Sequence, residues 1–214
     1  MSATVDSLLP LSFLEAVRNV DTPVEDFEAE LVSDLRNKRL GLSDTVYMQI
    51  KRFTDAVKRH QRTSHDEAAG LAKLIGRRPD AEAVFRAAGR YLAREAYQTI
   101  SPMTRRILLT LPAFFARPIA LRHTRKLSRR YFNGRVTRIG SSVYLEVERS
   151  VTQEAGPRSV GCTYYEAGLR EMLRLMVNSV GTVEHVRCSG RGEGACAWRA
   201  EWRPSEETTE SATA

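Results

Sequence analysis

Two cysteines near the C-terminal end of the chain are the residues whose type and spacing most clearly indicate chemistry. Cys188 and Cys196 flank a loop that holds Gly190, Gly192 and Gly194, with apolar residues on either side. This pattern predicts a tight antiparallel hairpin with one thiol on each strand. In a hairpin centred on Gly192 the two cysteines would face each other, at a separation that suits a disulfide or a shared metal ion.

Two further donors would complete a metal site. Zinc prefers four ligands in a tetrahedron, drawn from Cys thiolates and His nitrogens. Cys162 directly precedes a predicted amphipathic helix, where the helix dipole favours a thiolate. His185 lies shortly before Cys188. The set Cys162, His185, Cys188 and Cys196 would form a closed, structural zinc site with three thiolates and one imidazole.

Simpler interpretations of these residues stay open at this point. A cysteine without a ligand role is usually a small buried hydrophobe, and an isolated histidine is usually solvated or satisfied by a neighbour. Positions three apart on a regular strand also point to opposite faces. His185 and Cys188 would therefore share a metal only if their strand carried a bulge or a bend.

The elements that must position the donors follow from hydrophobic periodicity and turn residues. Residues 1–20 are weakly patterned and are expected to form a short helix or an arm. Helices are predicted over 21–40, 44–62, 65–76, 81–100 and 163–180, with a helical region over 101–130 that Pro112 and Pro118 interrupt. Strands are predicted over 135–140, 142–150, 182–189 and 195–202. The fold class is therefore α+β, with N-terminal helices followed by an antiparallel sheet and a long helix.

Length and composition bound the class of protein. The 214 residues suggest one domain with appendages or two small domains, and a hydrophobic share of 42% suffices for a core. The longest apolar run, 107–116, is shorter than the ~20 residues that span a bilayer. No basic residue precedes the apolar part of the N-terminus, so we expect no secretory signal and a cytoplasmic location. Thiols stay reduced there, which argues against a disulfide.

The basic residues are unevenly distributed. The formal net charge is +7, and no Asp or Glu occurs from Ala96 to Leu145, where many arginines lie. One interpretation is an anionic partner, which could be nucleic acid, an acidic ligand or a membrane surface on which 107–116 would lie. The interpretation we favour is a solvated basic face paired with the acids of 25–34. A DNA-binding unit with 43–62 as the reading helix is not favoured, because that helix has a wide apolar face.

The segment 161–202 resembles the C-terminal half of a 4-vinyl reductase-type domain. The shared features are a glycine before an apolar helix, a strand that ends in Cys, a Gly-rich turn, a second Cys and a closing strand. The segment 77–96 is similar to the helix near the start of such domains. The resemblance implies a ligand-binding domain over 75–202, after an N-terminal helical extension over 1–74. The polar composition of 203–214 predicts a disordered tail.

The resemblance also implies a zinc site. In the sensor domains of phenol- and xylene-responsive bacterial activators, this domain type uses one Cys before the helix, followed by an acid and two Cys on the final strands. Cys162, Cys188 and Cys196 match these positions, and His185 stands where the acid would be. That is a departure, although histidine is itself a good zinc ligand. The implied role is to join the hairpin to the helix, without catalysis.

The implied fold is similar to that of transport-particle (TRAPP) subunits and haem-NO-binding domains. The implied function is to bind a small hydrophobic or aromatic molecule, as a homodimer with a possible protein partner at the N-terminal helices. Phe114, Tyr144 and Tyr164 are the candidate pocket residues, with plain core as the alternative. The alternative functions are an adaptor of the same fold and an accessory factor in bacteriochlorophyll (tetrapyrrole) synthesis.

Reductase activity does not follow from these residues. The dense glycines of 190–194 lie between two strands and do not precede a helix, so they form no dinucleotide-binding fingerprint. No paired carboxylates or Ser-His-Asp arrangement stands out either. We therefore expect a binding protein that is not an enzyme.

Overall fold

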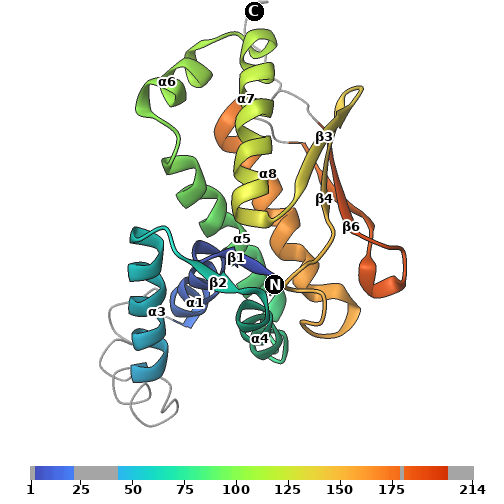
Figure 1. Ribbon diagram of the computed structural model, residues 1–214. Coiled ribbons are helices and arrows are strands. Elements are labelled where there is room, and N and C mark those ends of the chain that lie inside the picture. Colours follow the sequence, from blue (N-terminus) through green and yellow to red (C-terminus); the bar gives the residue numbers. More distant parts are fainter. Residues whose placement is uncertain (1–2, 22–42, 179–180, 202–214) are drawn as a thin grey trace, which may run out of the picture.

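Residues 3–21, 43–178 and 181–201 are described by a computed structural model of the protein (Figure 1). The helix predicted over 21–40, the acids of 25–34 and the tail over 203–214 lie outside the described residues, apart from Asp21. In the described part, helices and antiparallel strands form an α+β fold, as predicted.

The weakly patterned N-terminal residues form a strand and a buried helix. The short strand β1 (Thr4–Asp6) pairs antiparallel with β2 (Arg62–Ser64). Helix α1 (Leu8–Asp21) follows, and Asp6 Oδ1 accepts a hydrogen bond from the Leu8 backbone N–H at 3.0 Å. The first half of α1 is buried on all sides, so these residues belong to the core of the molecule.

The predicted helices of the first half are confirmed where the structure describes them, with two corrections: the helix predicted over 44–62 ends at Lys58, before strand β2, and Pro118 does not end a helix. They are α3 (Ser43–Lys58), α4 (His65–Gly76), α5 (Ala81–Gln98), α6 (Pro102–Thr110) and α7 (Ala113–Leu127). Pro112 separates α6 from α7 as expected. The prediction that Pro118 also interrupts the helix is wrong, because Pro118 lies inside α7. At this sixth position of the helix, proline removes one backbone hydrogen bond and crowds the preceding turn, but the helix continues to Leu127.

Four strands form the main sheet, in the order β3-β4-β6-β5 with every pairing antiparallel. Helix α8 (Thr163–Val177) lies between the two strand pairs in sequence, which confirms the predicted strand–strand–helix–strand–strand order. The strands are β3 (Arg135–Ile139), β4 (Ser142–Val147), β5 (Val183–Arg187) and β6 (Cys196–Glu201). Burial alternates along β4, so one face of the sheet meets the helices.

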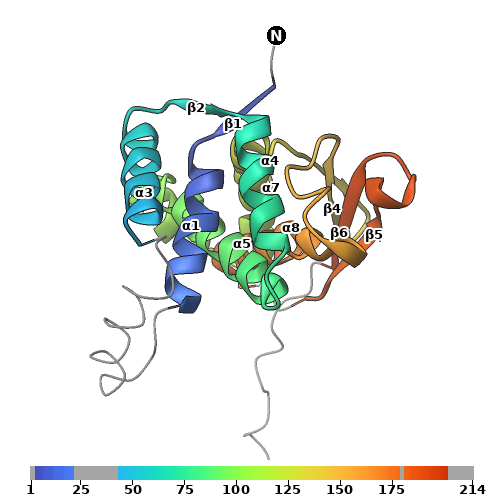
Figure 2. The same cartoon turned by 90° about the horizontal axis from the view of Figure 1, so that it is seen from below.

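The helices pack in layers behind this sheet (Figure 2). From one side to the other the layers are α3, α1, α5, α8 and the strands. One hydrophobic cluster runs through all of them, from Val5 on β1 to Ala200 on β6. The division at residue 75 into an extension and a ligand-binding domain stays a prediction.

A buried carboxylate joins α8 to α5. Glu171 on α8 is only 5% exposed, and its Oε1 lies 2.8 Å from Nε of Arg94 on α5. Nε of Arg174 lies 2.8 Å from Oε2 of the same carboxylate. Hydrogen bonds from Arg174, and then from Arg94, lower the pKa of Glu171 from its ordinary 4.5 to about 2. The ionised form is therefore favoured in the folded protein.

Replacing Glu171 with glutamine is expected to lower the free energy of unfolding by about 1–3 kcal/mol at neutral pH. A depressed folded-state pKa contributes stability above the unfolded pKa, and that stability is lost as pH falls towards about 2. The deficit of the variant should therefore shrink in acid. Urea unfolding across this pH range measures it, with Glu82→Gln on the exposed Glu82–Arg86 pair as control. Equal effects of the two substitutions would contradict the assignment.

Candidate metal centre

The structure brings the four predicted ligands together beside the start of α8. The ligand atoms of Cys162, His185, Cys188 and Cys196 all lie within 4.8 Å of one another. A tetrahedral zinc with Zn–S bonds of about 2.3 Å holds its ligand atoms roughly 3.5–4 Å apart. The cluster therefore needs only a small contraction to close on an ion. All three cysteines are buried and free.

A β-bulge allows His185 and Cys188 to share the site. His185 pairs with Trp198 across the β5–β6 ladder, whereas Arg187 pairs with Ala197, so Val186 is an extra residue on β5. The bulge changes the strand parity between His185 and Cys188, which a regular strand would point to opposite faces. The same shifted register, continued by one position, places Cys188 opposite Cys196.

The third cysteine reaches the hairpin from a tight turn. Cys162 ends the 3-10 turn η3 (Pro157–Cys162), directly before α8. Gly161 permits this position, because a Cβ there would lie 2.6 Å from the backbone oxygen of Thr152. A larger side chain would push the turn, and Cys162 with it, away from the neighbouring segment.

Hydrogen bonds around the sulfurs were not foreseen from the sequence. The Ser189 backbone N–H donates to Cys196 Sγ at 3.3 Å, and its hydroxyl lies 3.0 Å from the same sulfur. The Ser159 hydroxyl lies 3.1 Å from Cys188 Sγ. Glu193 Oε2 accepts the Cys188 N–H at 2.8 Å and fixes the hairpin loop. Of these partners, only Ser189 could have been suspected from the sequence, because it directly follows Cys188. Ser159 depends on a left-handed backbone, with φ of 58°.

The thiols are electrostatically coupled. A hydrogen bond from Cys162, aided by His185 and Ser189, lowers the pKa of Cys196 to about 3. The same hydrogen bond and burial raise the pKa of Cys162 above its ordinary value. The cluster therefore already favours one thiolate beside a protonated neighbour. A metal cation would replace the remaining thiol protons, so metal binding is expected to release protons and to weaken in acid.

The environment of the histidine also fits a zinc ligand. His185 Nε2 is buried and has no hydrogen-bond partner among the described residues. Its ring stacks on Trp198, with centroids 5.0 Å apart and planes 14° from parallel. A buried, unpaired ring nitrogen is costly unless it finds a partner such as a metal ion. Thiolates with an imidazole form a donor set that zinc prefers.

An open pocket of about 420 Å³ leads from solvent to this cluster. Its walls include two of the ligands and several polar neighbours, namely Ser159, Cys162, Thr163, Glu166, His185 and Arg191. The pocket supplies an entry path for an ion, which a site built inside a closed core would lack.

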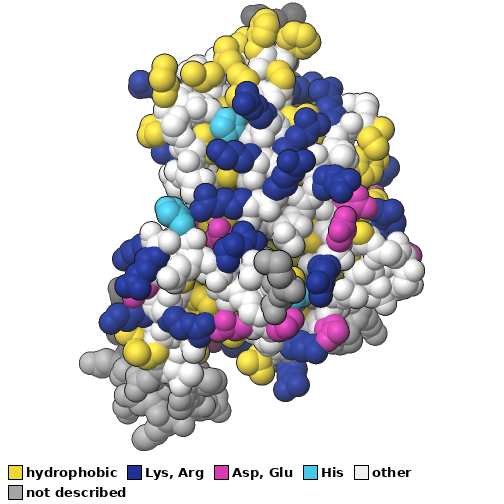
Figure 3. Space-filling model, viewed as in Figure 1, with side chains coloured by type: hydrophobic (Ala, Val, Ile, Leu, Met, Phe, Trp, Pro, Cys, Tyr) yellow, Lys and Arg dark blue, Asp and Glu magenta, His cyan; other side chains and the backbone are white. Residues whose placement is uncertain are grey.

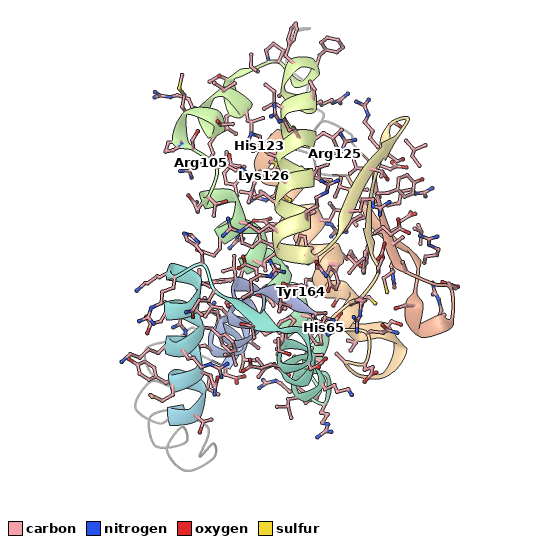
Figure 4. All side chains as sticks on the ribbon, viewed as in Figure 1. His65, Arg105, His123, Arg125, Lys126 and Tyr164 are labelled. Atoms are coloured by element: carbon pink, nitrogen blue, oxygen red, sulfur yellow. The ribbon has the colours of Figure 1, made fainter. Side chains whose placement is uncertain are left out.

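The three candidate pocket residues lie in different environments. Tyr164 is fully buried, and its hydroxyl lies 3.3 Å from Ser12 Oγ at the centre of the molecule (Figure 4). Tyr144 is half-buried on β4, opposite Arg199. Phe114 on α7 is 79% exposed. Among the described residues no ring contact joins the three, and their role in ligand binding stays a prediction.

The fold and the site together define an α+β protein in which the turn before a long helix and a sheet hairpin carry a Cys3His group close enough to bind a metal ion. Comparisons of the chain with family models, with curated proteins and with solved structures gave no match. Within the described ranges, no helix has the length and apolar character needed to cross a bilayer.

Proposed function

We propose that the protein is a non-catalytic, sensor-type binding domain of the 4-vinyl reductase type, with a structural zinc ion. It would bind a small hydrophobic or aromatic molecule. The observation that carries the proposal is the cluster of Cys162, His185, Cys188 and Cys196, with ligand atoms within 4.8 Å of one another. No position for an exchangeable water remains when all four residues bind, which is typical of structural zinc.

The zinc would act as a cross-link between two elements. Cys162 belongs to the turn before α8, whereas the other three ligands belong to the β5–β6 hairpin. Bound zinc supplies four strong bonds and no redox chemistry. The ion would add to the apolar contact that the hairpin already makes with α8, where the buried Trp198 packs on Tyr165.

A continuous series of aromatic rings connects the interior to this site. Phe13 on α1 contacts Tyr164 with centroids 5.0 Å apart, and Tyr164 contacts Tyr165 at 5.0 Å. Tyr165 contacts Trp198 at 4.9 Å, and Trp198 stacks on the ligand His185. A small aromatic molecule inserted among these rings would displace their neighbours in a close-packed interior. Binding of the molecule would therefore shift side chains on both α1 and the β5–β6 hairpin.

A second candidate function is an adaptor that assembles a complex without a ligand. It is favoured by the close packing of the rings in the interior, where centroids lie 4.9–5.9 Å apart. An accessory role in bacteriochlorophyll synthesis remains the third candidate.

Phenol is the probe for the sensor function. At a phenol concentration one hundred times Kd, linkage predicts about 2.7 kcal/mol of added stability, or roughly 5–10 °C in Tm for a chain of this size. Thermal unfolding with phenol, and with cyclohexanol as a non-aromatic control of similar size, measures it. Native mass spectrometry of the untreated protein would detect a molecule that co-purifies.

The outcomes separate the three candidates. A rise in Tm with phenol alone, or a co-purified aromatic compound, supports the sensor. Equal responses to the two probes, no retained compound and a stably bound protein partner would make the adaptor the better description. A retained tetrapyrrole pigment would support the accessory role.

A further inference from the structure

The helical hairpin formed by α6 and α7 exposes an apolar tip. Its large hydrophobic side chains point to solvent: Leu109 is 68% exposed, Phe114 79% and Phe115 59%. Met103, at the other end of α6, is 75% exposed. Only Leu108 of α6 is buried. Figure 3 shows hydrophobic side chains gathered at this end of the molecule, over α6 and the start of α7. Single exposed apolar residues are ordinary, but a group of this kind marks an interaction surface.

The chain builds the tip at the turn between the two helices. Pro112 ends the connection and α7 begins with the aromatic pair, whose rings meet edge to face at 5.3 Å. The buried side of α7 is used elsewhere, since Ala120, Thr124 and Leu127 face the core. The aromatic pair is therefore not an extension of the core.

A basic face begins directly below the tip. The exposed side of α7 carries Arg122, Arg125 and Lys126, and Arg129 lies in the π-helical turn η2 (Ser128–Phe132) that follows. With Arg62 and Arg130 these residues line an open hollow of about 560 Å³. Figures 3 and 4 show Lys and Arg side chains along the length of α7, with Arg125 and Lys126 labelled. Arg130 pairs with Asp6. Within the described ranges no carboxylate forms an ion pair with Arg122, Arg125, Lys126 or Arg129.

From these two features we infer that the α6–α7 tip docks on an anionic lipid surface. The exposed Phe and Leu side chains would enter the headgroup and acyl boundary, while the cations of α7 would neutralise lipid headgroups. Neither helix is long enough to cross a bilayer, since α6 has 9 residues and α7 has 15.

Charge and composition favour a lipid surface over other occupants. A second copy of the chain would bring two basic faces together, which is unfavourable. Nucleic acid would use the cations and could stack on Phe114 and Phe115, but it would leave the exposed aliphatic Met103 and Leu109 without an apolar partner. A bilayer with anionic headgroups offers an apolar layer and a charged layer at adjacent depths, as the tip and the face require.

Vesicle flotation with the full-length protein tests this inference. The protein is expected to float with vesicles that contain phosphatidylglycerol and to stay unbound with phosphatidylcholine alone. Phe114→Ser with Phe115→Ser should weaken binding at least about tenfold. Arg122→Glu with Lys126→Glu should weaken it at least about thirtyfold. A single Phe114→Trp variant should show a blue-shifted emission change on adding anionic vesicles.

Matched controls lie on α3, which belongs to a different layer. Tyr47→Ser with Met48→Ser removes an exposed apolar pair, since these residues are 66% and 60% exposed. Lys51→Glu with Lys58→Glu makes the same charge change as the α7 pair. Both control variants should bind as the wild type does. Circular dichroism should be unchanged in every variant, because each altered side chain is exposed.

Three results would overturn the inference. The first is equal binding to neutral and anionic vesicles, or binding to neither. The second is a tip variant that binds vesicles normally while converting a dimer into a monomer by light scattering, which would make the tip a dimer contact. The third is tight binding to a DNA duplex that survives the tip substitutions, with no vesicle binding.

Discussion

Serine at position 188 is expected to abolish metal binding and to destabilise the protein by at least about 3 kcal/mol. The Cys188 sulfur is one of four donors within 4.8 Å, and a serine hydroxyl is a poor zinc ligand. The purified wild type should hold one zinc per chain by elemental mass spectrometry, and the variant none. Losing the metal also leaves the buried Cys196 sulfur and the buried Nε2 of His185 without the cation that would pair with them.

A chelator separates loss of metal from loss of packing. Stripping the wild type with a chelator should lower its Tm to that of the Cys188→Ser variant and leave the variant unchanged. Ser159→Ala is the matched control, because it removes the 3.1 Å contact with Cys188 Sγ and keeps every ligand. That variant should retain zinc. A metal-free wild type that is as stable as Cys188→Ser would instead make these cysteines ordinary core residues, and the adaptor function would then be preferred.

The second large effect is expected at the crossing of α5 and α8. A Cβ on Gly89 of α5 would overlap the backbone oxygen of Tyr164 on α8 and lie 2.9 Å from the backbone N of Gly168. Both neighbours are backbone atoms, which cannot rotate away. Gly89→Ala should therefore separate the helices and lower the free energy of unfolding by at least about 3 kcal/mol. Urea unfolding measures this change.

The same substitution at an open site should have the opposite sign. Gly70 lies in α4, and a Cβ there would meet nothing within 4 Å. Gly70→Ala should raise stability by about 0.5–1 kcal/mol, since alanine is the better helix former. If both variants were equally stable, α5 and α8 would not be in the close contact described. Because Tyr164 lies next to Thr163 and Cys162, we also expect Gly89→Ala to weaken zinc binding.

Local signals explain the elements that were predicted correctly. The helix predicted over 65–76 is α4 (His65–Gly76), and the alternating segments near residue 140 are β3 and β4. Periodicity of this kind arises within a single element and needs no knowledge of its neighbours. The strands β1 and β2 have three residues each, which is too short for a period to be visible. They form because distant segments meet.

Exposure was harder to infer than secondary structure. The run 107–116 reads as apolar, yet Leu108 is buried while Leu109 and Phe114 point to solvent. In the sequence of a short helix, apolar residues that will be buried in a core look the same as apolar residues that will form a docking surface. Only the position of α6 and α7 at the edge of the helical layers distinguishes the two.

By itself, the sequence determined which donors are available and how they are spaced: Cys162 before a helix, and His185, Cys188 and Cys196 around a Gly-rich turn. The tertiary structure decided that these donors meet. The Val186 bulge turns His185 and Cys188 to one site, and the turn before α8 brings Cys162 to the hairpin. Strand register and helix position depend on long-range packing, which spacing along the chain does not encode.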